Sequence, residues 1–211
     1  MIMNNQLSHR VSLHGNVMVP YAYAQSVFNQ QELTAIIKMT NSMPLKTGTI
    51  AQRKDNKLST STNEEVRTSK TTFFSLDASN RWIFEKLDEV LMAMNNEYFQ
   101  MSVWGYDEIQ YSEYRAEDSG EYRWHMDTNI SPENLEPSGG MRKLSMSLLL
   151  NDDFEGGDFQ MNLSSEKKPS TIEMSAGTLI LFPSFLMHRV TPVTKNIRKS
   201  LVLWLLGNKF T

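Results

Sequence analysis

The sequence predicts an α+β fold in which N-terminal helices support a jelly roll, a sandwich of short β-strands. Two observations lead to this prediction. Apolar residues recur at helical spacing in the first half, and from Val103 onward the spacing becomes that of strands separated by turns. The length of 211 residues suits one domain with a sizeable core. We therefore expect a single domain over 1–211, with helical support and a loop in 1–102 and the jelly-roll core in 103–207.

Two segments of the first half have helical periodicity. In Gln30–Met39 the apolar residues fall on one face, and Asn29 with Glu32 three residues later is typical of a helix N-terminus. The second predicted helix covers residues 80–99. Its apolar face consists of Trp82, Ile83, Leu87, Val90, Leu91 and Met94. We expect both helices to pack on the outside of a sheet.

The segment Thr47–Lys70 lies between these helices. It is polar, rich in Ser, Thr and Lys, and short of apolar residues. This composition predicts a long loop, and long loops in compact domains are usually functional or disordered. A surface excursion without function is the alternative interpretation.

The second half contains about eight short segments with strand character, a number typical of a sandwich or jelly roll. Turn signals such as Asp118-Ser119-Gly120 and Glu155-Gly156-Gly157 separate them. The predicted strands are Trp104–Tyr114, Glu121–His125, Lys143–Leu150, Asp158–Leu163, Thr171–Met174, Gly177–Phe182, His188–Val193 and Lys199–Leu206. A jelly roll has an open mouth in which a small ligand can be held between the two sheets.

Charge and hydropathy argue against two classes of partner. The net charge is −3 and no run of Lys and Arg marks a basic patch, so we expect no nucleic-acid partner. No stretch approaches the ~18 to 20 consecutive apolar residues of a membrane span, and residues 1–20 do not have the pattern of a secretory signal. We expect a cytoplasmic protein without a membrane partner. The sequence does not indicate an oligomeric state.

The residues available to hold a metal are few. The chain has no cysteine, which excludes disulfides, Cys-ligated clusters and a thiolate nucleophile. Any metal must then be held mainly by His, Asp or Glu. Of the four histidines, His9 and His14 lie in a polar N-terminal segment without a suitably spaced acidic neighbour. His125 and His188 lie on predicted strands.

One histidine belongs to an H-x-D motif, His125-Met126-Asp127. On a strand, residues two apart point to the same face, so the imidazole and the carboxylate converge. With His188 they provide two imidazoles and one carboxylate, a set that leaves open positions on an iron(II) ion. Zinc is an alternative ion, although a structural zinc site usually has a fourth ligand. The H-x-D motif alone is weak evidence for a metal site. The alternative interpretation is that His125 and His188 are core histidines and Asp127 is a turn residue.

A candidate cation follows at Arg198, ten residues after His188 at the start of the last strand. The planar guanidinium binds a carboxylate through two hydrogen bonds and keeps its proton. Arg198 could instead be a solvated cation between Lys195 and Lys199. Its position at the start of the apolar last strand favours burial near the core.

The order and spacing of these motifs resemble the iron(II)/2-oxoglutarate-dependent dioxygenases. The flanking segments are similar to the prolyl 4-hydroxylase-like branch, including its PKHD-type bacterial members, over roughly residues 104–207. The segments that carry the resemblance are Tyr114–Ala116, Gly120–Asp127, Leu144–Leu150, Asn151–Phe159, Gly177–Pro183 and His188–Val190. The resemblance implies a double-stranded β-helix as the jelly roll, with 103–207 as the catalytic core.

The resemblance implies a role for five residues. The iron ligands would be His125, Asp127 and His188, and Arg198 would bind the distal carboxylate of 2-oxoglutarate. Tyr114 resembles the strand tyrosine that supports the cosubstrate, although its spacing to the first histidine is a residue or two longer than in some relatives. A core aromatic with a polar tip is the alternative for Tyr114.

Four further positions are weaker candidates. Ser200 shares a strand face with the arginine and could reach the same carboxylate. Trp204 and Tyr122 are candidates for the substrate side of the pocket, or for the core. Leu149 stands where some relatives have a second tyrosine, so that contact is expected to be missing or supplied elsewhere.

The implied function is hydroxylation of an unactivated C–H bond with iron(II), 2-oxoglutarate and O2, and it requires no side-chain nucleophile or general base. A peptidyl proline is the first substrate suggested, and a free amino acid or other small molecule is the alternative. The partner is then a protein, a peptide or a small-molecule substrate. A metal-binding jelly-roll module without turnover is the non-enzymatic alternative. A cupin-like dioxygenase would normally need further His or Glu ligands, so it ranks last.

Overall fold

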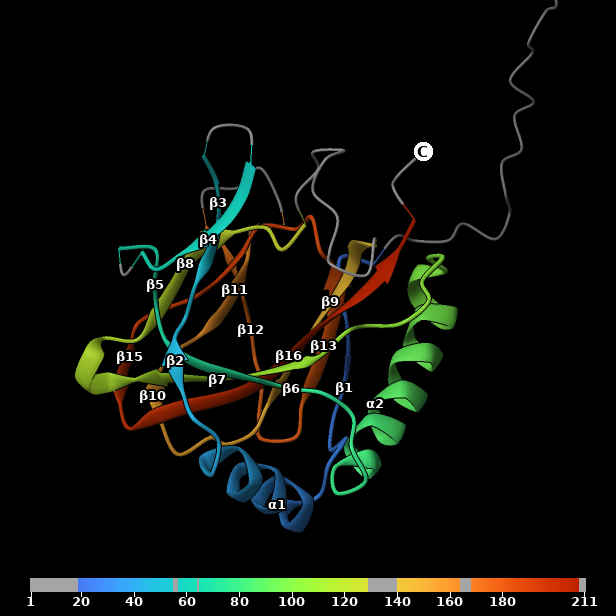
Figure 1. The fold of residues 1–211 in the computed structure, drawn as a ribbon, viewed down its shortest axis with the longest axis horizontal. Helices are drawn as coiled ribbons and strands as arrows, with labels where there is room; N and C mark the ends of the chain where they lie inside the picture. The colour runs from blue at the N-terminus through green and yellow to red at the C-terminus, as the bar shows by residue number, and fades with distance from the viewer. Residues whose placement is uncertain (1–18, 55–56, 64, 129–139, 164–167, 209–211) are drawn as a thin grey trace, which may run out of the picture.

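The computed structural model describes residues 19–54, 57–63, 65–128, 140–163 and 168–208. Within these ranges the chain forms two antiparallel sheets and two α-helices (Figure 1). One hydrophobic cluster joins the helices to the larger sheet, and a second cluster lies between the two sheets. This is the helix-supported jelly roll that the sequence predicts. No helix among the described residues is long and apolar enough to cross a membrane.

The larger sheet contains the strands that carry most of the core, in the order β1-β13-β9-β16-β7-β6-β2. Its strands are β1 (Ala22–Ala24), β2 (Lys46–Thr47), β6 (Lys70–Phe74), β7 (Ile109–Arg115), β9 (Met141–Leu149), β13 (Leu179–Pro183) and β16 (Ile197–Gly207). The smaller sheet has the order β12-β11-β14-β8-β5. Its strands are β5 (Arg67–Thr68), β8 (Glu121–His125), β11 (Phe159–Met161), β12 (Ser170–Ile172) and β14 (His188–Val190).

Two short strand pairs, one of them a hairpin, complete the described strands. In the first, β3 (Ile50–Lys54) pairs with β4 (Lys57–Ser61) and projects from one end of the molecule (Figure 1). In the second, β10 (Glu155–Gly156) pairs with β15 (Val193–Lys195). Strand β15 lies just before the start of β16, so this second pair lies near Arg198.

Strand β16 shows how alternation separates the core from the site. Leu201, Leu203 and Leu205 belong to the cluster that joins the sheet to the helices. The even-numbered residues of β16 point the other way, because successive side chains of a strand face opposite sides. Ser200 and Arg198 therefore face the space between the sheets, where both line a cavity.

The helices form where the sequence predicts them. Helix α1 (Gln30–Asn41) begins with a complete capping box, in which Asn29 Oδ1 accepts from the backbone N–H of Glu32 at 3.0 Å and Glu32 Oε2 accepts from the Asn29 N–H at 2.7 Å. Helix α2 (Arg81–Met94) continues into a five-residue π-helix (Asn95–Phe99), so the helical segment covers the predicted range 80–99 except for its first residue. Both helices pack their apolar faces on the larger sheet, as expected.

The prediction of a long loop over Thr47–Lys70 is wrong. The structure has β2, the β3–β4 hairpin and β5 in this segment, and β6 begins at its end. Strand β5 pairs with β8, and β6 pairs with β7. These strands are short and polar, so the hydrophobic alternation that reveals a strand is weak, and their partners lie far along the chain. The first half therefore contributes strands to both sheets as well as helical support.

Two strand predictions in the second half are wrong in extent. The strand predicted from Trp104 begins only at Ile109, and before it Gly105 forms an isolated bridge to Leu206. The single strand predicted over His188–Val193 is divided into β14 and β15, which belong to different sheets. The prediction that 1–211 form one domain stays a prediction, and the sharing of both sheets by strands from before and after residue 102 supports it.

Candidate functional site

The two strand histidines meet because β14 pairs antiparallel with β8. His188 is the first residue of β14 and lies opposite His125, the last residue of β8. The chain then turns beyond β8, and Asp127 donates its backbone N–H to Ser184 O at 2.9 Å. The carboxylate is thereby held next to both imidazoles. The structure brings together the three residues that the sequence predicts.

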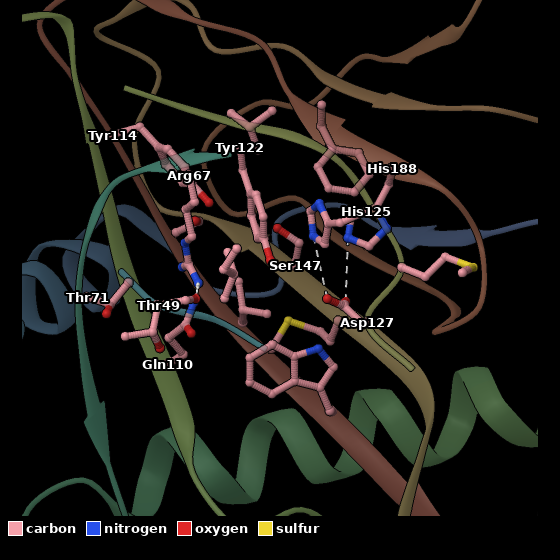
Figure 2. A pocket seen from close by; sticks show the side chains of 18 of the residues that line it. Thr49, Arg67, Thr71, Gln110, Tyr114, Tyr122, His125, Asp127, Ser147 and His188 are labelled. Carbon is pink, nitrogen blue, oxygen red and sulfur yellow. Dashed lines mark hydrogen bonds and ion pairs between the residues drawn. The ribbon is translucent and has the colours of Figure 1, made fainter. Parts of the chain in front are cut away.

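The three side chains offer their ligand atoms to one small volume (Figure 2). His125 Nε2 lies 3.6 Å from Asp127 Oδ1, and His188 Nε2 lies 3.5 Å from Asp127 Oδ2. The ligand atoms of all three residues lie within 4.8 Å of one another. Two imidazole nitrogens and one carboxylate oxygen fit a divalent transition metal and leave its remaining positions open.

The protein also sets the tautomer of both imidazoles. His125 Nδ1 lies 2.8 Å from the carbonyl oxygen of Arg123, and His188 Nδ1 lies 2.9 Å from that of Leu186. A carbonyl oxygen only accepts, so each Nδ1 carries the proton and donates it. Each Nε2 then presents its lone pair toward Asp127. Metal-binding histidines are typically oriented in this way.

Asp127 is held in its ionised form. Burial acts to raise its pKa, but the charges of His188 and His125 in their protonated forms, together with that of Arg142, outweigh that effect and hold the pKa below its usual range. The Ser145 hydroxyl donates to Asp127 Oδ2 at 2.7 Å and lies 2.9 Å from the Ser184 hydroxyl. The carboxylate is therefore charged and fixed in position.

Burial also favours the uncharged form of one histidine. It lowers the pKa of His188 to about 4, against the opposing effect of Asp127. The imidazole is therefore neutral near pH 7, the form that binds a metal. Phe182 and Phe159 surround it, with ring centroids 4.8 and 5.6 Å from that of His188. These apolar rings shield the His188 side of the triad from solvent.

Arg198 lies in the core and is not a solvated cation. Only 2% of the residue is exposed, and its Nη1 donates to the Ser200 hydroxyl at 3.2 Å. Its Cζ lies 5.7 Å from the centre of the Tyr114 ring, which is opposite it on β7. No carboxylate of the described residues lies within ion-pair distance of the guanidinium. A buried, unpaired cation facing a cavity is suited to a carboxylate ligand.

The turn predicted at Glu155-Gly156-Gly157 packs against the side chain of Arg198. Gly157 has φ +64°, a conformation that side chains rarely adopt. A Cβ built there would lie 2.9 Å from Val193 Cγ2 and 3.0 Å from Arg198 Cδ. Glycine therefore allows the backbone to pack directly on the arginine side chain.

A cavity of about 340 Å³ connects the triad with Arg198. Tyr114 and Ser200 line it beside the arginine, and Tyr122 and Trp204 line it elsewhere, as the sequence suggests. Leu149 is buried and lies opposite Ser200 in the sheet. His9 and His14 lie outside the described residues.

Sequence reasoning missed several residues of this site. Ser145 supports the carboxylate, and Arg67, Thr71 and Gln110 line the cavity. Arg142 also lines it, with its Cζ 3.7 Å from the centre of the Trp204 ring. Only the alternation of Ser145 and Ser147 along β9 hinted that this strand has a polar inner face.

Residues 109–206 match the family model described as the 2OG-Fe(II) oxygenase superfamily. This segment contains the triad and Arg198. This part of the chain is similar to that superfamily. The family uses Fe(II), 2-oxoglutarate and O2.

Curated relatives of this segment agree with the family match. It is similar to a PKHD-type hydroxylase of Synechococcus sp. (strain CC9311), with 37% identity over 93 residues, which are 43% of this chain and 39% of the relative. A PKHD-type hydroxylase of Aliarcobacter butzleri (strain RM4018) is 34% identical over 93 residues, 43% of this chain and 40% of the relative. The match thus spans about two fifths of the length of these curated relatives.

Solved structures show the same fold over most of the chain. A Pseudomonas putida prolyl-4-hydroxylase superposes with a TM-score of 0.66 at 18% identity, covering 90% of this chain and 93% of that one. A prolyl hydroxylase of Trichoplax adhaerens, solved with a hypoxia inducible factor oxygen degradation domain peptide fragment, gives a TM-score of 0.68 at 17% identity, covering 89% and 84%. The jelly roll and its supporting elements are therefore those of this fold.

Proposed function

We propose that this oxygenase binds Fe(II) through His125, Asp127 and His188, binds 2-oxoglutarate with Arg198 and Tyr114, and hydroxylates an unactivated C–H bond of a peptidyl proline. The observation that carries the proposal is the orientation of both imidazoles, whose Nε2 atoms lie 3.5 to 3.6 Å from the carboxylate of Asp127. Two imidazole nitrogens and one carboxylate oxygen, already turned toward one another, suit a metal that keeps open positions.

Each residue of the chain has a separate task in this proposal. Iron(II), 2-oxoglutarate and O2 supply the oxidising chemistry, with succinate and carbon dioxide as coproducts. Arg198 binds the far carboxylate of the cosubstrate and orients its 2-oxo acid end toward the triad. Ser200 lies within hydrogen-bond distance of Arg198 Nη1 and helps to position its guanidinium. The chemistry requires no side-chain nucleophile, which agrees with a site built for binding and orientation.

The buried arginine independently supports the cosubstrate. In the described part of the chain its charge has no carboxylate partner, although buried charges are normally paired. A dicarboxylate that reaches from the triad to Arg198 supplies that partner. A metal-binding module without turnover gives this arginine no role, so the enzyme explains more of the structure.

Relatives support proline as the substrate residue. The two structural neighbours are prolyl hydroxylases, and one was solved with a peptide fragment. In this chain the cavity continues past Tyr122 toward Thr49 and Ile50, at the foot of the β3–β4 hairpin. A peptide lying along this side of the cavity would place one residue beside the triad. A free amino acid or another small molecule is the alternative substrate for the same machinery.

Mass spectrometry of the products tests the proposed substrate. We expect the Fe(II)-loaded protein, given 2-oxoglutarate and O2, to add one oxygen atom, about 16 Da, to proline in some members of a pool of proline-centred peptides. Asp127→Asn, which keeps the shape of the side chain but removes its charge, should give no such product. Oxygen added to other residues, or only to free amino acids supplied in a parallel reaction, would contradict prolyl hydroxylation and favour the alternative.

A further inference from the structure

A second buried guanidinium lies in the same cavity, on the wall opposite the larger sheet. It belongs to Arg67 of β5, of which only 6% is exposed. We propose that Arg67 binds a carboxylate of the substrate, so that the enzyme acts on acidic substrates. The proposal rests on the proposed function and adds to it the chemical class of the substrate.

The position of Arg67 is built by the fold. Strand β5 pairs with β8, and this pairing places Arg67 opposite Tyr122. Arg67 Nε donates to the Ser69 hydroxyl at 2.8 Å, and Nη1 donates to the backbone carbonyl of Thr49 at 3.1 Å. Its Cζ lies 4.7 Å from the centre of the Tyr122 ring. Two neutral acceptors and an aromatic face orient the guanidinium without neutralising it.

The charges around Arg67 leave it without a counter-ion. Among the described residues no carboxylate lies within ion-pair distance of its guanidinium. The acidic residue that lines this cavity is Asp127, which the two histidines flank and which the proposed metal would use. A buried cation normally has an anionic partner, because desolvating a lone charge is costly. An anion brought by a ligand would supply it.

If 2-oxoglutarate binds Arg198, it cannot also be the anion that pairs with Arg67. The two guanidiniums belong to different sheets, with Arg67 on β5 of the smaller one and Arg198 on β16 of the larger one. Each has its own aromatic neighbour, Tyr122 for Arg67 and Tyr114 for Arg198. 2-Oxoglutarate has one carboxylate away from its chelating end, so one of the two arginines is left for another ligand.

Arg67 is close enough to the reaction centre to contact a substrate. The Tyr122 ring stacks on His125 with a centroid separation of 3.5 Å and an interplanar angle of 13°. Figure 2 shows Tyr122 between Arg67 on one side and His125 on the other. The guanidinium therefore lies one aromatic ring beyond a proposed metal ligand. A substrate carbon at the triad and a carboxylate at Arg67 would be a few bonds apart.

The neighbouring wall is polar, as an anion site requires. Thr71 and Gln110 line the cavity and are buried, with 6% and 4% of each residue exposed. Figure 2 shows both, with Thr49, on the Arg67 side of Tyr122. The fork of Arg67 suits a carboxylate better than a neutral amide, because charge-assisted hydrogen bonds are about twice as strong as neutral ones. The carboxylate could belong to an acidic side chain of a peptide or to a small molecule.

Selection from mixed pools of ligands tests the preference for acidic substrates. Mn(II)- and 2-oxoglutarate-loaded protein, kept anaerobic, is exposed to acetylated, amidated peptides with a central proline and random flanks. A second arm offers N-acetyl amino acids beside their amides, which distinguishes a small-molecule carboxylate from a side chain. We expect enrichment of Asp or Glu over Asn or Gln at one flanking position, or of acids over amides, by about tenfold or more. Arg67→Gln should reduce this ratio to near one.

Two variants and one spectroscopic measurement separate the possible causes. Arg67→Lys keeps the charge and should keep a reduced acidic preference, and Arg81→Gln, an exposed residue on α2, should not change it. The Fe(II)–2-oxoglutarate absorption band should persist in Arg67→Gln. A missing band in the unmodified protein would count against the proposed function itself.

Three results would overturn the Arg67 proposal while the band is present. The first is no preference for acidic ligands in either arm. The second is a preference that Arg67→Gln leaves intact. The third is a complete loss of the acidic preference in both Arg67→Lys and Arg67→Gln. That result would mean that the preference depends on packing against Tyr122 and not on charge.

Discussion

His188→Ala is expected to abolish substrate-dependent formation of succinate. His188 supplies one of the three proposed iron ligands, and its Nε2 lies 3.5 Å from Asp127 Oδ2. Changes to residues that only support a metal ligand typically reduce metal affinity ~10 to 100-fold, so loss of a ligand itself should reduce Fe(II) affinity at least as much. Turnover should fall to the background of the metal-free protein. Succinate assays at saturating 2-oxoglutarate, with iron content measured in parallel, check this.

The variant must remain folded for that result to be informative. His188 is buried between Phe159 and Phe182, so the alanine leaves a cavity that is expected to lower stability. Circular dichroism and a urea titration would establish the folded fraction at the assay temperature. His188→Gln provides the matched control, because it fills more of the space but lacks the imidazole. Full succinate formation by a folded His188→Ala protein would contradict the triad.

Arg198→Ala is expected to raise the 2-oxoglutarate requirement more than it changes the maximal rate. Removing one partner of a buried ion pair typically costs ~3 to 5 kcal/mol, which corresponds to roughly 100- to 4000-fold in affinity. The alanine variant would leave the distal carboxylate of the cosubstrate buried and unpaired. Initial rates over a range of 2-oxoglutarate concentrations, at fixed iron, give the KM and kcat separately.

The stability of the ligand-free protein provides the control for this variant. Arg198 is buried without a carboxylate partner among the described residues, and burial lowers its pKa. Replacing it by Met, which has similar length and no charge, should leave the free energy of unfolding unchanged or raise it. Arg198→Met should nevertheless share the 2-oxoglutarate defect. An unchanged KM for 2-oxoglutarate in both variants would remove Arg198 from the cosubstrate site.

Predictions of helices and strands from the sequence were most accurate where the local residue pattern agrees with the fold. The capping residues Asn29 and Glu32 indicated α1, and the continuous apolar run Leu201–Leu206 indicated β16. The H-x-D spacing indicated that His125 and Asp127 converge, but the strand period is not the reason, because β8 ends at His125 and Asp127 is held in the turn beyond it by its N–H bond to Ser184. The pairing of β14 with β8 then brings His188 to them.

The rest of the site depends on pairings that no local pattern encodes. Strand β5 has two residues, Arg67 and Thr68, and it exists because β8 provides its hydrogen-bond partners. Its polar composition resembles a loop, so the second cavity arginine was not found. Ser145 lies within the continuous, mostly apolar β9 and has no signal that distinguishes it as a partner of Asp127. Such contacts arise only when distant strands are assembled.

The most direct test is anaerobic titration of the Fe(II)-loaded protein with 2-oxoglutarate, recorded by visible absorption. A cosubstrate that chelates the iron produces a weak charge-transfer band. We expect the band to grow to saturation in the unmodified protein, to require much more 2-oxoglutarate in Arg198→Ala, and to be absent in His125→Ala. Bound iron with no band at any 2-oxoglutarate concentration would contradict the cosubstrate assignment, and the metal-binding module without turnover would then be the better account.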